Sequence, residues 1–182
     1  MTRKRSGWVF GLILVCLLAV FHGVAAGEEQ RYINHDYGFS FPISQDMNLY
    51  TPDHPGPFAF KEENIFILAN KWKPNEFIMV NLSAVTAEEE LQSMMETIDS
   101  RGLPQPDYHK VAVRYTNIGG NQQKRAVEHI FNMQAGAPKT MRQICFVHKG
   151  KGFAFICTTD ADHFQETNQS FFDPFFRSIT FE

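Results

Sequence analysis

The sequence lacks the motifs that mark most enzyme active sites. It holds only three cysteines, and because Cys16 lies in an apolar N-terminal stretch, too few remain for a cysteine-based metal site. No histidine pair has the HExxH spacing of a zinc protease, and no glycine-rich segment matches a phosphate-binding loop. A Gly-x-Ser-x-Gly nucleophile motif is also absent. We therefore assign no catalytic, metal-binding or cofactor-binding residue from the sequence.

A cluster of basic residues is missing beyond the first few positions. Arg3, Lys4 and Arg5 account for three of the 17 lysines and arginines, and the other 14 stand against 20 acidic residues. An acidic chain without a basic run binds the phosphate backbone poorly. Nucleic acid is therefore not an expected partner.

A long hydrophobic run occurs at the N-terminus. The basic residues precede the apolar stretch 8–21, and the small residues 24–26 follow it, which is the order of a cleavable secretory signal peptide. The alternative is an uncleaved anchor, because the longer stretch from residue 8 to residue 26 approaches the roughly 20 residues that a spanning helix needs. His22 and Gly23 interrupt it and favour cleavage.

We therefore expect residues 1–26 to be a signal peptide and residues 27–182 to form a single domain, long enough to bury one core. The protein is expected to be periplasmic or secreted, without a stable membrane anchor after cleavage. Cys16 follows Val15 rather than a small residue, which argues against a lipoprotein cleavage site.

Short apolar segments between turn residues predict strands in the first part of the domain. Aromatic residues alternate within 32–43, which predicts a strand that ends near Pro42. The runs 65–72 and 76–85 are rich in β-prone residues and are separated by the turn residues 73–75. They predict a β-hairpin.

A helix is predicted over 86–101. Thr86 and Glu89 match a capping box, and Gly102 and Pro104 supply the signals that end a helix. Between them an apolar stripe has helical spacing, which indicates a face turned toward a core. The stripe consists of Leu91, Met94, Met95 and Ile98.

Four more strands and a C-terminal helix follow. The strands are expected within 111–118, 127–133, 141–148 and 153–159. Asp162 is placed to cap a helix, and Asp173 with Pro174 predicts a second cap that restarts it. Short turns between successive strands indicate antiparallel pairing. The predicted class is α+β, a mostly antiparallel sheet flanked by helices in an α/β/α sandwich.

Cys145 and Cys157 lie in the last predicted hairpin, where either of two redox states is open. If 150–152 form a three-residue turn, the two cysteines lie directly opposite each other, within the distance that a disulfide spans. A two-residue turn instead places the two sulfurs on opposite faces of the sheet, as free thiols.

Two neighbouring pairs, His35 with Asp36 and Asp53 with His54, could each offer two ligands to a cation. Both pairs lie in predicted turns or loops, and we interpret them as solvated polar residues. His129 alternates with apolar residues on its strand and is expected to be a hydrogen-bonded, half-buried histidine rather than a catalytic base.

Phenylalanine is frequent, with 18 copies. Most of these side chains are expected in the core. Exposed aromatic residues often line a groove or a docking patch. The loop 55–58 and the pair Phe171 and Phe172 are where the sequence places such a feature.

The order of elements resembles that of the PsbP-like, or Mog1/PsbP-like, domains of photosystem accessory proteins and bacterial exported proteins. The resemblance is carried by the opening segment 37–42 (YGFSFP), the helix that begins at Thr86, the paired hairpins of 111–159 and the closing segment 175–181 (FFRSITF). The tryptophan that often follows the opening proline in this family is absent here. The resemblance implies a sheet between helices and a mostly non-enzymatic binding or assembly role.

Two functional hypotheses follow. The first is an exported, non-catalytic binding or assembly module of the cell envelope, whose partner is another envelope protein or a small apolar ligand. The second is an extracytoplasmic hydrolase or metal-dependent enzyme whose site forms only in three dimensions. A deep pocket lined by His, Asp and Glu would favour the second, and a shallow apolar or acidic face would favour the first.

Overall fold

The computed structural model describes residues 30–58, 65–81, 88–101, 107–134 and 136–182. The predicted signal peptide, the capping residue Thr86 and the helix-ending residues Gly102 and Pro104 lie outside these residues. Within them, no helix is both long enough and apolar enough to cross a membrane.

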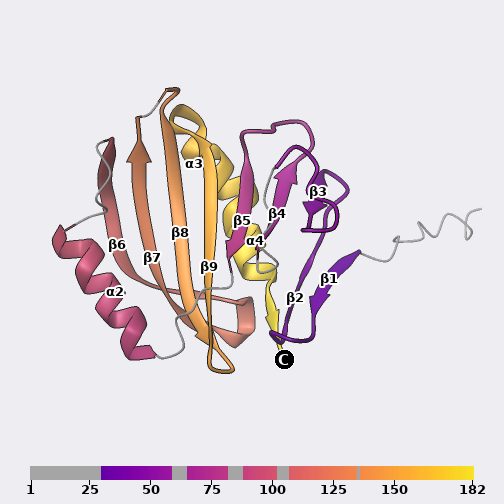
Figure 1. The fold of residues 1–182 in the computed structure, drawn as a ribbon, viewed down its shortest axis with the longest axis horizontal. Coiled ribbons are helices and arrows are strands. Elements are labelled where there is room, and N and C mark those ends of the chain that lie inside the picture. The colour runs from indigo at the N-terminus through magenta and orange to yellow at the C-terminus, as the bar shows by residue number, and fades with distance from the viewer. Residues whose placement is uncertain (1–29, 59–64, 82–87, 102–106, 135) are drawn as a thin grey trace, which may run out of the picture.

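A seven-stranded sheet forms the centre of the domain (Figure 1). Every pairing between its described neighbours is antiparallel. The predicted hairpins are therefore confirmed. Across the sheet the strands are β3 (Met47–Tyr50), β4 (Ile65–Asn70), β5 (Phe77–Asn81), β9 (Lys151–Asp160), β8 (Lys139–His148), β7 (Lys124–Met133) and β6 (Tyr108–Ile118).

A second, three-stranded sheet joins the two ends of the domain. It consists of β1 (Arg31–Asn34), β2 (Phe39–Pro42) and β10 (Thr180–Phe181), with β2 in the middle. The single strand predicted over 32–43 is therefore wrong, because a turn divides it. The Asn34 side-chain oxygen accepts a hydrogen bond from the Tyr37 backbone at 3.1 Å, and Gly38 takes a positive φ of 66°, which an L side chain rarely adopts.

Helices flank both faces of the large sheet, as predicted for the α+β class (Figure 1). Helix α2 (Glu88–Arg101) contacts β6, β7 and β8. The opposite face is covered by a C-terminal helical segment, defined here as residues 161–178. It consists of the short 3-10 turn η2 (Ala161–His163), α3 (Phe164–Thr167), the π-helical turn η3 (Asn168–Phe172) and α4 (Asp173–Ser178). A further 3-10 turn, η1 (Gly120–Gln122), links β6 and β7.

The second cap predicted at Asp173 is wrong, because the helix continues through it. Phe172 and Asp173 both have helical backbone angles. A proline inside a regular α-helix clashes with the carbonyl group four residues earlier and removes one hydrogen bond. The π-helical turn immediately before Pro174 widens the backbone there, which allows the helix to run on.

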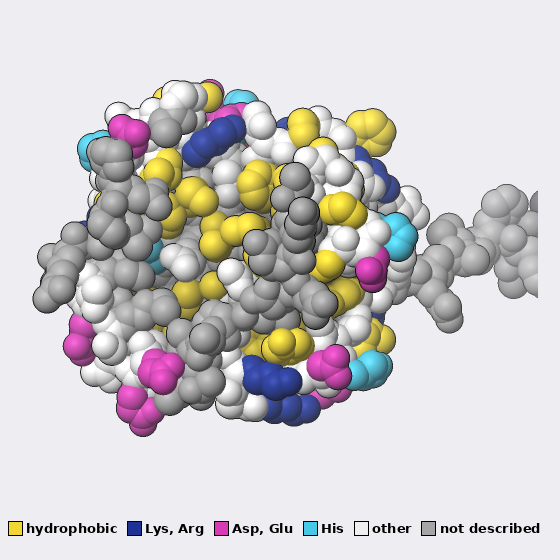
Figure 2. Space-filling view, in the orientation of Figure 1, with side chains coloured by type: hydrophobic (Ala, Val, Ile, Leu, Met, Phe, Trp, Pro, Cys, Tyr) yellow, Lys and Arg dark blue, Asp and Glu magenta, His cyan; other side chains and the backbone are white. Residues whose placement is uncertain are grey.

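The main core lies between the large sheet, the small sheet and the C-terminal helical segment. It is rich in aromatic side chains, of which six phenylalanines are almost fully buried: Phe39, Phe41, Phe146, Phe153, Phe155 and Phe172. A smaller cluster on the other face joins Leu91 of α2 to the sheet. The side chains of Met94, Met95 and Ile98 lie outside the described residues. Viewed toward this second face, hydrophobic side chains gather over the middle of the sheet and acidic ones lie near its edge (Figure 2).

Of the two redox states left open for Cys145 and Cys157, the structure has the free thiols, and the turn geometry explains why. Lys149 and Gly150 form a two-residue turn with φ of 49° and 72°, and the register places Cys145 opposite Ala154 rather than opposite Cys157. Cys157 lies in the aromatic core and Cys145 faces the α2 side. Both thiols are free and buried, and burial raises the pKa of Cys145 to about 12 and that of Cys157 in the same direction.

Candidate functional site

A groove of about 310 Å³ lies between the C-terminal helical segment and the chain that leads from β2 to β3. Its size is near the lower end of the range for ligand pockets. Six apolar residues and three serines line it, and none of these described residues is ionisable. The lining consists of Pro42, Ser44, Met47, Leu68, Ser170, Phe171, Pro174, Phe175 and Ser178.

The helix positions most of this lining through its own periodicity. Ser170, Pro174 and Ser178 recur at every fourth position, and Phe171 and Phe175 recur likewise on the adjacent row. Residues four apart lie on one face of a helix. That face is turned toward the strands, where Leu68 belongs to the buried part of β4.

The serines add little hydrogen-bonding capacity to the groove. Ser170 Oγ donates to the Glu166 carbonyl at 2.8 Å, and Ser178 Oγ donates to the Phe175 carbonyl at 2.7 Å. Ser44 Oγ accepts from the Asp46 backbone at 3.3 Å. With two of three hydroxyl protons already committed and no base in the lining, the groove suits an uncharged, apolar group better than a reacting substrate.

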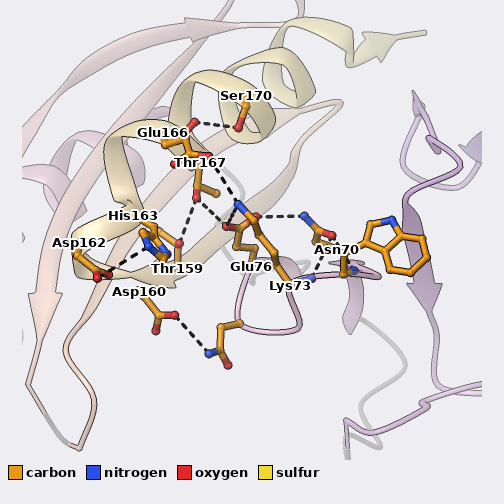
Figure 3. Close-up of polar contacts among 12 residues, drawn as sticks. Asn70, Lys73, Glu76, Thr159, Asp160, Asp162, His163, Glu166, Thr167 and Ser170 are labelled. Atoms are coloured by element: carbon orange, nitrogen blue, oxygen red, sulfur yellow. Dashed lines mark hydrogen bonds and ion pairs between the residues drawn. The ribbon is translucent and has the colours of Figure 1, made fainter.

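A polar cluster at one end of the groove ties the β4–β5 hairpin to the helix (Figure 3). The buried carboxylate of Glu76 accepts hydrogen bonds from Thr167 Oγ1 at 2.9 Å and from Asn70 Nδ2 at 3.1 Å, and it pairs with Lys73 Nζ at 3.2 Å. Lys73 also lies 3.7 Å from the Glu166 carboxylate. Because a buried carboxylate without such partners is costly, the cluster fixes the hairpin against the helix.

Trp72 stands on the tip of this hairpin and is 76% exposed. Its backbone N–H donates to Asn70 Oδ1 at 2.9 Å, and its indole N–H donates to Asp46 Oδ1 at 3.0 Å. The sequence placed Trp72 in a strand over 65–72, but the strand ends at Asn70, whose side chain holds the turn. Asn70, followed closely by the turn residues 73–75, was the sequence signal that could have located the tip of the hairpin.

A second polar cluster connects the C-terminal helical segment to strands β7 and β8. The buried Arg142 of β8 donates to Glu128 Oε1 at 2.7 Å, to Asn168 Oδ1 at 2.7 Å and to Asp173 Oδ1 at 2.5 Å. Arg114 binds the second oxygen of Glu128. Asn168 and Asp173 lie at the two ends of the π-helical turn, so Arg142 fixes the part of the helix that lines the groove.

Of the two aromatic features predicted from the sequence, the Phe171 pair leads to the groove. Phe171 lines it, whereas Phe172 is buried in the core. In the loop 55–58, Phe58 packs on Tyr50 and Phe77, with ring centroids 5.2 and 5.6 Å apart, beside a more open depression of about 450 Å³.

The histidine pairs do not assemble into a metal site. Within the part of the chain that the structure describes, no group of three His, Cys, Asp or Glu residues could hold a metal ion. His35 is exposed in the β1–β2 turn, 3.9 Å from Glu182, and Asp53 and His54 are exposed in the loop after β3.

His129 is more buried than the sequence predicted, at 1% exposed. Its Nε2 lies 2.7 Å from the Tyr108 hydroxyl, and its ring stacks on Phe131 with centroids 4.6 Å apart. Burial lowers its pKa. His129 lies on the α2 side of the sheet, with Val127 of the same strand face, so it contributes nothing to the groove on the opposite side.

Stability is expected to fall as the pH drops below about 6.5. Burial lowers the pKa of His129 and of His148 in the folded state, whereas the unfolded chain takes up protons at the ordinary histidine pKa. Each histidine therefore contributes a slope of up to about 1.4 kcal/mol per pH unit. Urea unfolding at pH 7.5, 6.5 and 5.5 measures it.

His129→Gln should reduce this slope, while the control His163→Gln, at a side chain 54% exposed, should leave it unchanged. A wild-type stability that does not change between pH 7.5 and 5.5 contradicts the prediction.

Comparison with known proteins shows which solved structures have a similar fold. No family model matches this sequence, and neither does any curated protein. Among solved structures, the cyanobacterial PsbP protein CyanoP of Synechocystis sp. PCC 6803 has a TM-score of 0.58 at 15% identity, over 88% of this chain and 96% of that one. LpqN of Mycobacterium tuberculosis, described as involved in cell envelope biogenesis, has a TM-score of 0.51 at 12% identity, over 84% and 90%.

A protein of Bacteroides thetaiotaomicron has a TM-score of 0.54 at 10% identity, over 85% of this chain but only 48% of its own. Likeness at such low identity shows the fold alone. The resemblance predicted from the sequence is confirmed at that level: the chain folds as a PsbP/Mog1-like α+β domain.

Proposed function

We propose that this protein is an exported, non-catalytic binding or assembly module of the cell envelope, and that its groove receives an apolar group from an envelope protein or a small ligand. The observation that carries the proposal is the lining of the groove, which is apolar and contains no ionisable residue among those described. The N-terminal signal-peptide pattern supports export to the periplasm or the medium. The likeness in fold to LpqN, described as involved in cell envelope biogenesis, supports a role in the envelope.

The alternative, a hydrolase or metal-dependent enzyme, finds no support in the groove. Hydrolysis needs a base within hydrogen-bond reach of a nucleophile or of a water molecule. The three serines of the groove contact backbone groups instead.

Filling the groove tests the proposal. N-phenyl-1-naphthylamine is an uncharged apolar dye whose fluorescence rises on binding. Ser170→Trp places an indole in the groove from an exposed helix position, and we expect it to weaken dye binding at least about tenfold, roughly 1.4 kcal/mol. The matched control is Gln169→Trp, an exposed neighbour on the same helix that does not line the groove, and it should bind as the wild type does.

Equal binding by Ser170→Trp and wild type would place the dye elsewhere, for example on the apolar centre of the opposite face (Figure 2). That outcome, or no binding by the wild type, contradicts the proposal. Thermal melts of both variants establish that each is folded.

A further inference from the structure

We infer that the groove and Trp72 form one docking surface for an extended segment of a partner protein. The segment inserts an apolar side chain into the groove, packs on the exposed indole and carries a carboxylate that pairs with Lys71. This inference rests on the proposed function, since it names the partner of the same groove.

The two features are joined by four consecutive residues. Ser44 and Met47 line the groove. Between them, the Asp46 carboxylate accepts the indole N–H of Trp72 at 3.0 Å, and the Gln45 carbonyl accepts from Lys71 Nζ at 2.5 Å. A ligand that leaves the groove across this segment therefore meets Trp72.

The other side of the hairpin tip reaches the helix that lines the groove. Lys73 lies 3.7 Å from Glu166, whose carbonyl accepts the hydroxyl proton of Ser170. In Figure 3 the Lys73 side chain extends toward Glu166, with Ser170 one turn further along the helix. The tip thus spans one end of the groove, from the segment 44–47 to the helix.

Trp72 has the properties of a residue that anchors a protein interface. The hydrogen bond from its indole N–H to Asp46 restrains the side chain in one orientation, so less side-chain freedom is lost on binding. Its indole N–H is already bonded, which leaves the ring faces for contact with a partner. Tyr115, another exposed aromatic side chain, is covered by the Arg125 guanidinium at 3.9 Å. Interface hot spots are enriched in tryptophan.

Charge and size favour a protein segment as the occupant. Lys73 is neutralised by Glu76 and Glu166, whereas Lys71 forms no ion pair with a carboxylate among the described residues and donates to a carbonyl instead. Asp46 and Glu166 add negative charge beside the lysines at this end of the groove. An anionic membrane surface would repel these two carboxylates. A groove of about 310 Å³ suits one or two side chains.

A peptide selection tests the inference. Random twelve-residue peptides displayed on phage are selected on the purified protein, and the most enriched ones are synthesised and measured by fluorescence anisotropy. We expect a large apolar residue near an Asp or Glu. Their affinity should fall about 30-fold in Trp72→Ala, the effect of removing a hot spot, and at least about tenfold in Ser170→Trp. The control Tyr115→Ala should bind as the wild type does.

Three outcomes overturn the inference. If Ser170→Trp abolishes dye binding but no selected peptide depends on Trp72, the groove binds an apolar ligand and the proposed function stands without the protein partner. If the peptides depend on Trp72 and not on Ser170, the two features do not form one surface. If neither dye nor peptide binds, the proposed function falls as well. Trp72 is exposed, so its variant tests binding rather than folding.

Discussion

Replacing Arg142 with alanine is expected to lower the free energy of unfolding by about 3–5 kcal/mol. The buried carboxylate of Glu128 would lose its hydrogen bond from Arg142. Asn168 and Asp173 would lose the guanidinium group that holds the π-helical turn to β8. Removing one member of a buried ion pair leaves the other charge uncompensated, which is the most costly way to break it. Urea unfolding of wild type and variant measures the loss.

Arg114→Ala is the matched control, because Arg114 binds the same carboxylate from a side chain that is 64% exposed. Its loss should cost about 1 kcal/mol or less. The double variant Glu128→Met with Arg142→Met should recover much of the stability, since no unpaired charge then remains buried. Equal, small losses for Arg142→Ala and Arg114→Ala would show that the buried pair does not hold the helix.

Leu91→Ala is expected to cost about 2–5 kcal/mol of unfolding free energy. Leu91 is 2% exposed and packs with Val127, Cys145 and Ala154, which links α2 to β7, β8 and β9. Truncation removes buried methyl groups and leaves a cavity against the sheet. The exposed neighbour Gln92 serves as control, and Gln92→Ala should change stability by less than about 0.5 kcal/mol. A loss of less than half a kcal/mol in Leu91→Ala would mean that α2 does not dock through this residue.

Local patterns predicted the elements of this fold well. The helical spacing after Thr86 predicted α2 and its contact through Leu91, and the alternating runs of the second half predicted β6 to β9. These signals depend only on the period with which a single segment buries its side chains. The fold class followed from their order, because short turns between strands permit only antiparallel neighbours.

The strand register and the turn type of the β8–β9 hairpin could not be predicted from the sequence, because they depend on packing between segments. The glycines at 150 and 152 fit both a two-residue and a three-residue turn. The observed two-residue turn requires a positive φ at Lys149. Lysine has no preference for this conformation, so the residue type does not predict the turn. In the resulting register Phe153 lies opposite Phe146, and both enter the aromatic core. That packing is what separates the two cysteines.

The groove was only partly predictable for the same reason. Phe171 was identified as an aromatic residue of interest, but Met47 joins it from more than a hundred positions away through the fold. Trp72 was missed because the apolar run 65–69 before it was extended through Trp72 as one strand. The π-helical turn was missed because Pro174 suggested a break, whereas the contacts of Arg142 stabilise a widened helix there.

The most direct test of the account is to observe the groove while it is occupied. Met47 lines the groove, whereas Met79 alternates with the core residues Ile78 and Val80 and points to the opposite face. NMR spectra of protein labelled with ¹³C at the methionine methyl groups can therefore separate the two faces. On addition of N-phenyl-1-naphthylamine, the account predicts intermolecular NOEs from the dye to the Met47 methyl group and none to Met79. NOEs to Met79 without NOEs to Met47 would contradict it.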